Sequence, residues 1–338
     1  MVNLYVGEKC SCLLNGARGA SQHASGFYFG LQVYTDVGVD DAWALMITLA
    51  QPQVEVLAIT TVHGNAPVDQ VTRNACLVLD QMEYQPPVFK GADRALMGAN
   101  IVSSIDFMGS DGLGGYSATC SPSTRTIEAQ PAALALIQFV HQNPQQITLL
   151  ALGPLTNLAL AVRLDESFAR NVARLVVMGG AVQGQGNASR AAEFNIYADP
   201  EAAQIVFNAG FADMWLLPWE TCLKYPYLWK DYDILKSRPS QRLRFAVGVM
   251  DGLAQFLQER LGAPGLILPD PLAATVCLSP ELVTQAPLAG LAIETNGAIG
   301  RGLTAVDWLG NYETEHRVHI ITELDQNQAF DIINQGLQ

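Results

Sequence analysis

The chain has 338 residues, 49% of them hydrophobic, which is enough for a large buried core and favours one α/β domain. With 32 acidic and 19 basic residues it carries a net charge of −13, so it lacks the basic surface that binding to nucleic acid or to anionic membranes needs. We therefore expect a neutral or small substrate.

Residues 1–30 show no hydrophobic period and contain several glycines and serines, which indicates an irregular N-terminal extension. From residue 31 to 338 the sequence reads as a single domain. Its first part is predicted to form strands at 31–35, 54–61 and 88–90 and helices at about 39–50 and 67–82. Strands joined by amphipathic helices form right-handed βαβ units, so we expect a mostly parallel open sheet flanked by helices.

A glycine-rich loop at 106–115 separates this part from a second run of alternating elements. Strands are predicted at 147–151, 174–178 and 213–217, and helices at 131–142, after 155, after 199, at 241–260, at 272–278 and at 326–337. The stretch 285–338 is predicted to be β-rich before its final helix. Between these elements lies a cluster of aromatic residues that belongs either to the core or to a partly exposed surface near a pocket: Trp219, Tyr225, Tyr227, Trp229 and Tyr232.

The six cysteines are scattered, and only Cys10 and Cys12 are closely spaced, which favours reduced thiols. No apolar run approaches the roughly 18 residues that a membrane-spanning helix needs. The N-terminus also lacks an apolar segment followed by a cleavage site. These features predict a soluble cytoplasmic protein without a membrane partner.

Three carboxylates lie within six residues on the predicted turn between the first strand and the first helix: Asp36, Asp40 and Asp41. Carboxylates this close repel one another unless protons or a cation neutralise them, and oxygen ligands favour Ca²⁺ or Mg²⁺. A structural role is the alternative, with Asp40 and Asp41 complementing the helix dipole while Asp36 caps the turn. The spacing alone is compatible with both.

Polar residues follow four of the predicted strands. Asp36 follows the first strand and His63-Gly64-Asn65 the second, while Leu152-Gly153 and Met178-Gly179-Gly180 follow the strands at 147–151 and 174–178. Ligands of open parallel sheets bind outside the carboxyl ends of the strands, so these residues are expected to line one crevice. The loop at 183–195 adds Asn187, Glu193 and Asn195, which suit a polyhydroxyl group such as a sugar.

Four segments at these positions resemble the signature motifs of the inosine–uridine type nucleoside hydrolases. They are DVGVDDA (36–42), TTVHGN (60–65), ALGPLTN (151–157) and AAEFN (191–195), in the order and spacing of that family. The resemblance implies a Rossmann-like nucleoside hydrolase fold and a homodimer or homotetramer. It also implies hydrolysis of the N-glycosidic bond of ribonucleosides to ribose and free base, by attack of a Ca²⁺-bound water.

The resemblance also implies roles for single residues. Asp36, Asp41 and Asp270 would bind Ca²⁺ through their side chains and Leu152 through its carbonyl, and Asp36 would accept the proton of the attacking water. The ribonucleoside would be held by a second set of residues: Asp40, Asn65, Met178, Asn187, Glu193 and Asn195. Carboxylates around the sugar would stabilise an oxocarbenium-like transition state.

The sequence departs from the family pattern at three positions. Tyr34 stands where the first motif usually has another aspartate, and Met108 and Pro269 stand where many members have histidines that activate the departing base. One hypothesis is that an aromatic residue from 219–232 stacks on the base and favours purines. The preferred base and the acid that protonates it are not predicted by the sequence.

Two other functions are compatible with parts of the pattern. An aspartate-rich turn after a strand also suggests a Mg²⁺-dependent phosphohydrolase, although Arg190 is the only basic residue in the predicted rim loops. A nucleoside- or ribose-binding protein with weak or no turnover would retain the same pocket. Ribose release from nucleosides separates an enzyme from a binding protein.

Overall fold

The computed structural model describes residues 29–98, 108–312, 314 and 316–338. Residues 1–28 of the predicted extension, Cys10 and Cys12 among them, and the start of the glycine-rich loop therefore lie outside the described residues. Among the described residues no helix is long and apolar enough to cross a membrane.

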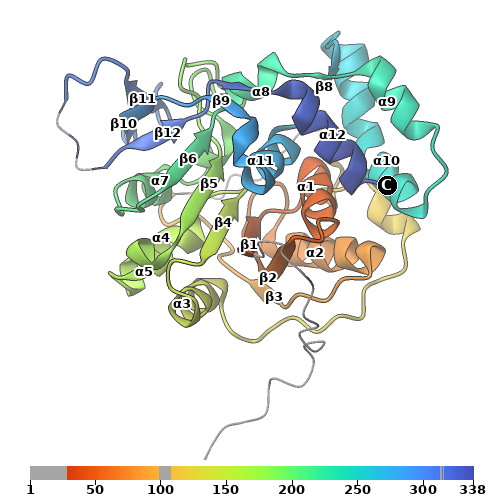
Figure 1. Cartoon of the computed structure of the whole chain (residues 1–338), viewed down its shortest axis with the longest axis horizontal. Coiled ribbons are helices and arrows are strands. Elements are labelled where there is room, and N and C mark those ends of the chain that lie inside the picture. The colour runs from red at the N-terminus through yellow and green to blue at the C-terminus, as the bar shows by residue number, and fades with distance from the viewer. Residues whose placement is uncertain (1–28, 99–107, 313, 315) are drawn as a thin grey trace, which may run out of the picture.

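A nine-stranded sheet forms the centre of the domain, as Figure 1 shows. Its order is β11-β10-β12-β6-β5-β4-β1-β2-β3. The strands from β12 to β3 are parallel neighbours, while β10 is antiparallel to both β12 and β11. The strand bounds are β1 Phe29–Thr35, β2 Val54–Thr61, β3 Val88–Lys90, β4 Ile147–Ala151, β5 Arg174–Met178, β6 Met214–Leu217, β10 Leu288–Ile293, β11 Thr304–Asp307 and β12 Val318–Ile320. The predicted mostly parallel α/β fold is confirmed.

Helices cover both faces of this sheet (Figure 1). On one face, side chains of β1 pack with α1 (Val39–Leu49), α2 (Val68–Met82), α10 (Gln241–Gln255), α11 (Pro269–Leu278) and α12 (Gln326–Gly336). On the other face the core includes α3 (Ala132–Gln142), α4 (Thr156–Leu164), α5 (Phe168–Asn171) and α7 (Pro200–Phe207). Because both faces are covered, residues 31–35 of β1 are fully buried, the polar Gln32 and Thr35 included.

The remaining elements are short. They comprise α6 (Phe194–Ala198), α8 (Trp219–Lys224), α9 (Trp229–Lys236), a π-helical turn at Phe256–Arg260, two 3₁₀ turns at Tyr116–Thr119 and Pro280–Leu282, and two small sheets that pair β7 (Tyr227–Leu228) with β8 (Gly265–Leu266) and β9 (Val283–Gln285) with β13 (Glu323–Leu324).

The structure shifts several predicted boundaries. The first strand begins at Phe29, two residues earlier than expected. Helix α11 begins at Pro269, three residues before the predicted start, because proline fits the first turn of a helix, where its missing N–H is not needed. The predicted helix at 241–260 changes to a π-helical turn after Gln255. Strand β11 was not predicted, since four residues at a sheet edge give a weak pattern.

Candidate active site

Four adjacent strands place the polar residues predicted to line one crevice. In the order β5-β4-β1-β2, Tyr34 pairs with Ala151 and Thr35 with Thr61, so the carboxyl ends of these strands lie level with one another. Strand β2 lies beside β1 on one side, and β4, which comes later in the chain, lies beside β1 on the other side. The sheet therefore has its topological switch point at β1, where ligands of open α/β sheets bind.

A cavity of about 470 Å³ opens at these strand ends. One part of its wall is polar and carries every residue that was predicted to bind the substrate, together with two residues of the predicted metal set: Asp40, Asn65, Leu152, Met178, Asn187, Glu193, Asn195 and Asp270. Asp36 and Asp41 are fully buried and lie behind this wall. The structure thus brings the predicted residues to one site.

Three carboxylates meet where two helices begin. Asp40 and Asp41 lie in the first turn of α1 and Asp270 in the first turn of α11. Each offers one oxygen, and these three oxygens lie within 4.8 Å of one another. Helix N-termini favour negative charge. The proximity of a third carboxylate from a distant segment goes beyond what dipole capping of a single helix requires.

Asp41 is held in place by several hydrogen bonds. Its Oδ2 accepts hydrogen bonds from the Gly38 N–H at 2.9 Å and from Asn65 Nδ2 at 3.0 Å. Its Oδ1 accepts a hydrogen bond from the Thr35 hydroxyl. These contacts fix the carboxylate at the start of α1 and connect the ends of β1 and β2.

Asp36 occupies a space that two glycines leave open. A Cβ atom on Gly64 would lie 2.0 Å from its Oδ2, and one on Gly153 would lie 2.6 Å from its Oδ1. Oδ2 accepts a hydrogen bond from the Asn65 N–H at 2.8 Å. Oδ1 is buried and has no hydrogen-bond partner among the described residues. A buried oxygen without a partner is costly and therefore indicates that a ligand completes the site.

Burial raises the pKa of each of these carboxyl groups. For Asp36 and Asp270 the pKa lies well above its ordinary value, first because of burial and then because of the neighbouring aspartates. The pKa of Asp40 rises to about 7 for the same reasons. A divalent cation would favour the ionised forms, because an opposite charge lowers the pKa of a carboxyl group. The buried oxygen donors therefore fit a hard cation.

In each of the three asparagines of the cavity wall, one side-chain atom forms hydrogen bonds within the protein. Asn65 donates through Nδ2 to Asp41, and Asn195 donates through Nδ2 to the Leu152 carbonyl at 2.8 Å and to the Met178 carbonyl at 3.2 Å. Asn187 accepts the Phe194 N–H through Oδ1 at 2.8 Å. The Oδ1 atoms of Asn65 and Asn195 thus stay available as acceptors and Nδ2 of Asn187 as a donor, which suits hydroxyl groups.

Glu193 caps the short helix α6. Its carboxylate accepts hydrogen bonds from the Gly180 N–H at 2.8 Å and the Asn195 N–H at 2.9 Å. Burial nevertheless raises its pKa to about 7. Glu193 thus orders the loop that carries Asn195, besides lining the cavity itself.

Another part of the cavity wall is apolar. It is formed mainly by side chains from the start of α8, the end of α10 and the turns beside them: Met108, Trp219, Leu253, Phe256, Leu257 and Pro269. The two positions at which histidines were expected from the family pattern thus lie at the cavity and carry a methionine and a proline. No histidine among the described residues lines it.

Each of the two alternatives for the aromatic cluster holds for some of its residues. Trp219 lines the cavity, whereas Tyr227 and Tyr232 are buried in the core. Sequence reasoning missed Tyr197 and Phe256, which also line the cavity. Tyr197 follows Asn195 by two positions, which was an available signal, whereas Phe256 has no motif beside it.

Tyr34 and His63 lie close to the site but do not line the cavity. Tyr34, in place of the usual aspartate, is buried against the opposite face of the sheet and donates its hydroxyl to the Pro154 carbonyl. His63 is buried, and its Nε2 lies 3.2 Å from the Thr156 hydroxyl, which donates to Asp199 at 2.7 Å. Both residues support the strand ends.

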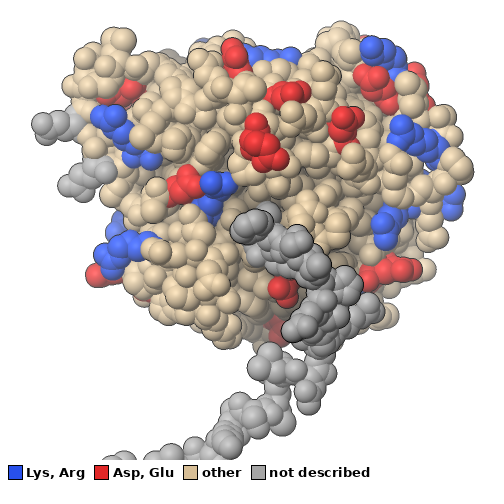
Figure 2. All heavy atoms as spheres, viewed as in Figure 1, with Lys and Arg blue, Asp and Glu red and all other residues tan. Residues whose placement is uncertain are grey.

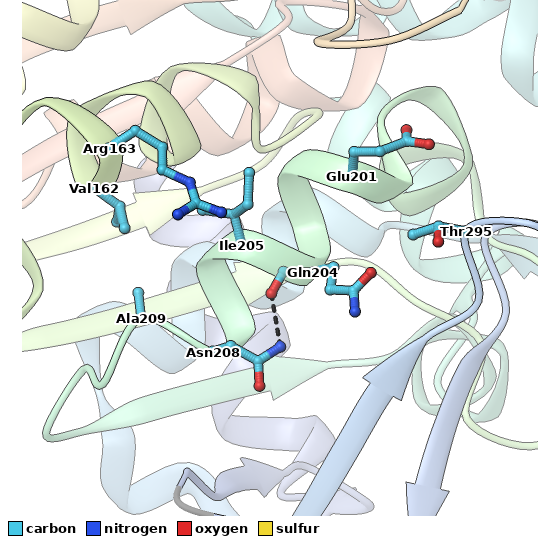
Figure 3. Close-up of a pocket in the computed structure, with 8 residues that line it drawn as sticks. All are labelled: Val162, Arg163, Glu201, Gln204, Ile205, Asn208, Ala209 and Thr295. Atoms are coloured by element: carbon cyan, nitrogen blue, oxygen red, sulfur yellow. Dashed lines mark hydrogen bonds between the residues drawn. The ribbon is translucent and has the colours of Figure 1, made fainter.

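A second hollow of about 490 Å³ lies between α4 and α7 (Figure 3). Arg163, Glu201, Gln204 and Asn208 are among its lining residues, and Asn208 donates to the Gln204 carbonyl at 2.8 Å. None of the clustered aspartates lines it. The chemistry of the predicted site therefore belongs to the first cavity.

Comparisons with known proteins agree with this geometry. The family model described as inosine-uridine preferring nucleoside hydrolase matches residues 33–331. A protein of Oryza sativa subsp. japonica named "Probable uridine nucleosidase 2" is 36% identical over 274 residues, which cover 81% of this chain and 80% of that protein. The "Inosine-uridine preferring nucleoside hydrolase" of Crithidia fasciculata is 30% identical over 308 residues, covering 90% of this chain and 95% of that protein. A solved plant nucleoside hydrolase matches with a TM-score of 0.85 at 31% identity, covering 91% of this chain and 98% of that one.

Proposed function

The chain belongs to the inosine–uridine preferring nucleoside hydrolase family and is a ribonucleoside hydrolase, and we propose that it works with Ca²⁺ and with Asp36 as the general base. The observation that carries this proposal is the buried Oδ1 of Asp36, which has no hydrogen-bond partner in the described part of the chain and belongs to the same site as Asp40, Asp41 and Asp270. A general base needs a lone pair that no other hydrogen bond occupies, within reach of the proton that it accepts.

Asp36, Asp41 and Asp270 would hold the cation, together with the Leu152 carbonyl. Only one hydrogen bond to that carbonyl, from Asn195, is seen among the described residues, and a carbonyl oxygen has two lone pairs. When bound, Ca²⁺ would neutralise these acids and lower the pKa of a water molecule that it orients. In this proposal Asp36 would accept the proton of the attacking water through Oδ1.

The polar wall would bind the ribose. Hydroxyl groups of the sugar donate to Asp40, Asn65 Oδ1 and Asn195 Oδ1, and Asn187 Nδ2 donates to a sugar oxygen. The carboxylates around the ring stabilise the positive charge that develops as the N-glycosidic bond breaks. A site that is built for hydroxyl groups discriminates against deoxynucleosides, because its own polar groups then stay unpaired.

The apolar wall would bind the base. Trp219 and Phe256 offer flat aromatic faces, and stacking on such faces tolerates different bases because every base has a π-face. Purine rings offer more stacking area than pyrimidines, so we expect inosine to be hydrolysed at least as well as uridine. The names of the relatives make these two nucleosides the first substrates to test.

Phosphate esters suit this cavity less well. Among the described residues no lysine or arginine lines it, whereas phosphate sites usually supply such cations. On the face shown in Figure 2, basic and acidic side chains are interspersed and no continuous basic patch is visible. A binding protein without turnover differs from the proposal only in the rate of ribose release, which an assay measures directly.

The test is release of reducing sugar from inosine, adenosine, uridine and cytidine, before and after treatment with a chelator. We expect turnover that the chelator abolishes and that Ca²⁺ restores better than Mg²⁺. Ligand-dependent stabilisation without ribose release would instead identify a binding protein. A strong preference for uridine would contradict the proposed stacking. The cytoplasmic location and a homodimeric or homotetrameric assembly stay predictions.

A further inference from the structure

Glu220 is a buried carboxylate outside the cluster of aspartates. It is the second residue of α8 and only 4% exposed. Its Oε2 accepts a hydrogen bond from the Val182 N–H at 3.0 Å, and its Oε1 accepts hydrogen bonds from the N–H groups of Gln183 at 2.7 Å and Gln185 at 3.2 Å. One side chain thus satisfies three backbone donors in the first part of the loop between β5 and α6.

That loop carries a residue of the polar wall but has no helix or strand of its own. Its later part is closed by local bonds, since the N–H groups of Asn187, Ala188 and Ser189 all lie within 3.2 Å of the Ala192 carbonyl. Glu193 has separate anchors at Gly180, Asn195 and Ile196. The contacts to Glu220 therefore fix the part of the loop that leads directly into Asn187.

The same turn of α8 also connects this loop to the apolar wall. Trp219, which precedes Glu220, lines the cavity. Its backbone N–H donates to the Gly180 carbonyl at 2.9 Å. Trp219 and Glu220, which are consecutive, thus both bind the start of the loop, and Trp219 also contributes its side chain to the cavity wall. A displacement of the loop relative to α8 would change the distance between the sugar-binding and base-binding walls.

We propose that Glu220 is a positioning residue for ribose recognition, which holds Asn187 at the distance from the apolar wall that a ribonucleoside requires. This inference rests on the proposed binding of ribose by the polar wall. Glu220 itself does not line the cavity, so it would act on the substrate only by positioning the loop. A carboxylate suits this role because it is acceptor-only, while an amide in its place turns an NH₂ group toward at least one N–H donor.

The test is a double-mutant cycle of Glu220→Gln and Asn187→Ala, read as KM and kcat for inosine and uridine. In the wild-type background Glu220→Gln should raise KM about ten-fold for both substrates, since it leaves a buried N–H group unpaired and displaces the loop. In the Asn187→Ala background the same change should raise KM less than about two-fold, because the residue through which Glu220 acts is gone.

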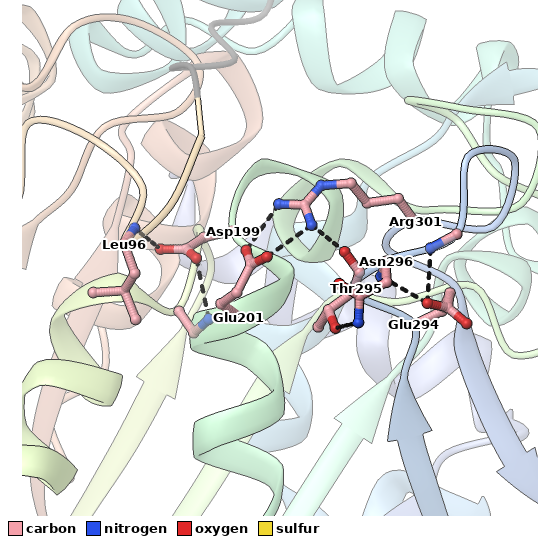
Figure 4. Close-up of polar contacts among 9 residues, drawn as sticks. Leu96, Asp199, Glu201, Glu294, Thr295, Asn296 and Arg301 are labelled. Atoms are coloured by element: carbon pink, nitrogen blue, oxygen red, sulfur yellow. Dashed lines mark hydrogen bonds and ion pairs between the residues drawn. The ribbon is translucent and has the colours of Figure 1, made fainter.

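Glu294→Gln is the matched control. Glu294 also accepts two backbone N–H groups, from Asn296 at 2.7 Å and Gly297 at 2.9 Å, but on the exposed connection between β10 and β11 (Figure 4). This variant should keep the KM of the wild type. If Glu220→Gln does not fold, as its thermal unfolding midpoint would show, Glu220→Asp keeps the charge, shortens the side chain and should give a smaller rise in KM with the same dependence on Asn187.

An unchanged KM of a folded Glu220 variant would overturn the inference. Equal effects in both backgrounds would also overturn it, and so would an effect on inosine alone, which would place the role of Glu220 in the base-binding wall. Failure of the proposed function is recognised separately, because the wild-type protein would then release no ribose from either nucleoside.

Discussion

The two walls of the cavity differ in the residues and in the secondary-structure elements that form them. The polar wall consists of residues at the carboxyl ends of adjacent strands and at helix N-termini. In it the Asn65 side chain donates to Asp41 and the Asn195 side chain to the Leu152 carbonyl, while Asp36 lies buried behind the wall and accepts the Asn65 N–H. The apolar wall comes largely from α8, α10 and the π-helical turn, where Trp219 and Phe256 contribute faces rather than hydrogen-bonding groups. We therefore expect the first wall, with the buried aspartates behind it, to determine the chemistry and the sugar, and the second wall to determine the base.

The strongest test of this division is Asp36→Asn. The amide keeps the shape of the side chain but is a poor base, so kcat should fall about 10³-fold for every nucleoside, within the usual range for loss of a general base. Steady-state kinetics measures this. Asp307→Asn is the matched control, since Asp307 accepts hydrogen bonds from two backbone N–H groups in an exposed turn. An unchanged kcat would contradict the role of Asp36.

Asn195→Ala tests the sugar-binding role of the same wall. The change leaves the carbonyls of Leu152 and Met178 without their donor and removes the Oδ1 acceptor. We expect kcat/KM to fall roughly 100-fold, by the same factor for inosine and uridine, because the ribose is common to both. Kinetics with both substrates measures this. A fall in kcat/KM that differs between inosine and uridine would contradict the assignment of the sugar and the base to different walls.

Trp219→Ala tests the apolar wall. Loss of one stacking face should lower kcat/KM about ten-fold, the order measured for base stacking, and should change the ratio of inosine to uridine hydrolysis. The four-nucleoside panel reports that ratio. Equal losses for all four bases would mean that Trp219 contributes to something other than base recognition.

His63, behind the polar wall, should affect stability rather than turnover. Burial lowers its pKa from the ordinary 6.5 to about 4, so between these values the unfolded chain binds the extra proton. Stability from this residue is therefore present above about pH 6.5 and is lost as the pH falls, by about 2 kcal/mol at pH 5. Urea unfolding at pH 7 and pH 5 should show a smaller acid loss for His63→Gln than for the wild type. Equal losses of stability in the variant and the wild type would contradict the role of His63 in acid destabilisation.

The contrast between the walls also explains what the sequence could predict. Asp36 and Asn65 stand directly after or close behind apolar strands, and the rule for open sheets is sufficient to bring them together. Asn195 stands at the end of the loop that follows β5, in a motif of the family. Phe256 and Leu257 have the pattern of any amphipathic helix, and only the packing of α10 turns them toward the cavity. The hydrogen bonds of Glu220 are equally invisible in sequence, because its three donors are backbone groups nearly forty positions away.

The acidic cluster also has a consequence for how the chain matures. Its members are residues 40, 41 and 270, so two of them are made early in synthesis and the third only much later. During synthesis the first aspartates emerge long before the last one, and a cation could be held tightly only once α11 has docked against α1. Metal binding would then stabilise only the completely folded domain. A chain that ends before Asp270 would contain only Asp40 and Asp41, which repel each other.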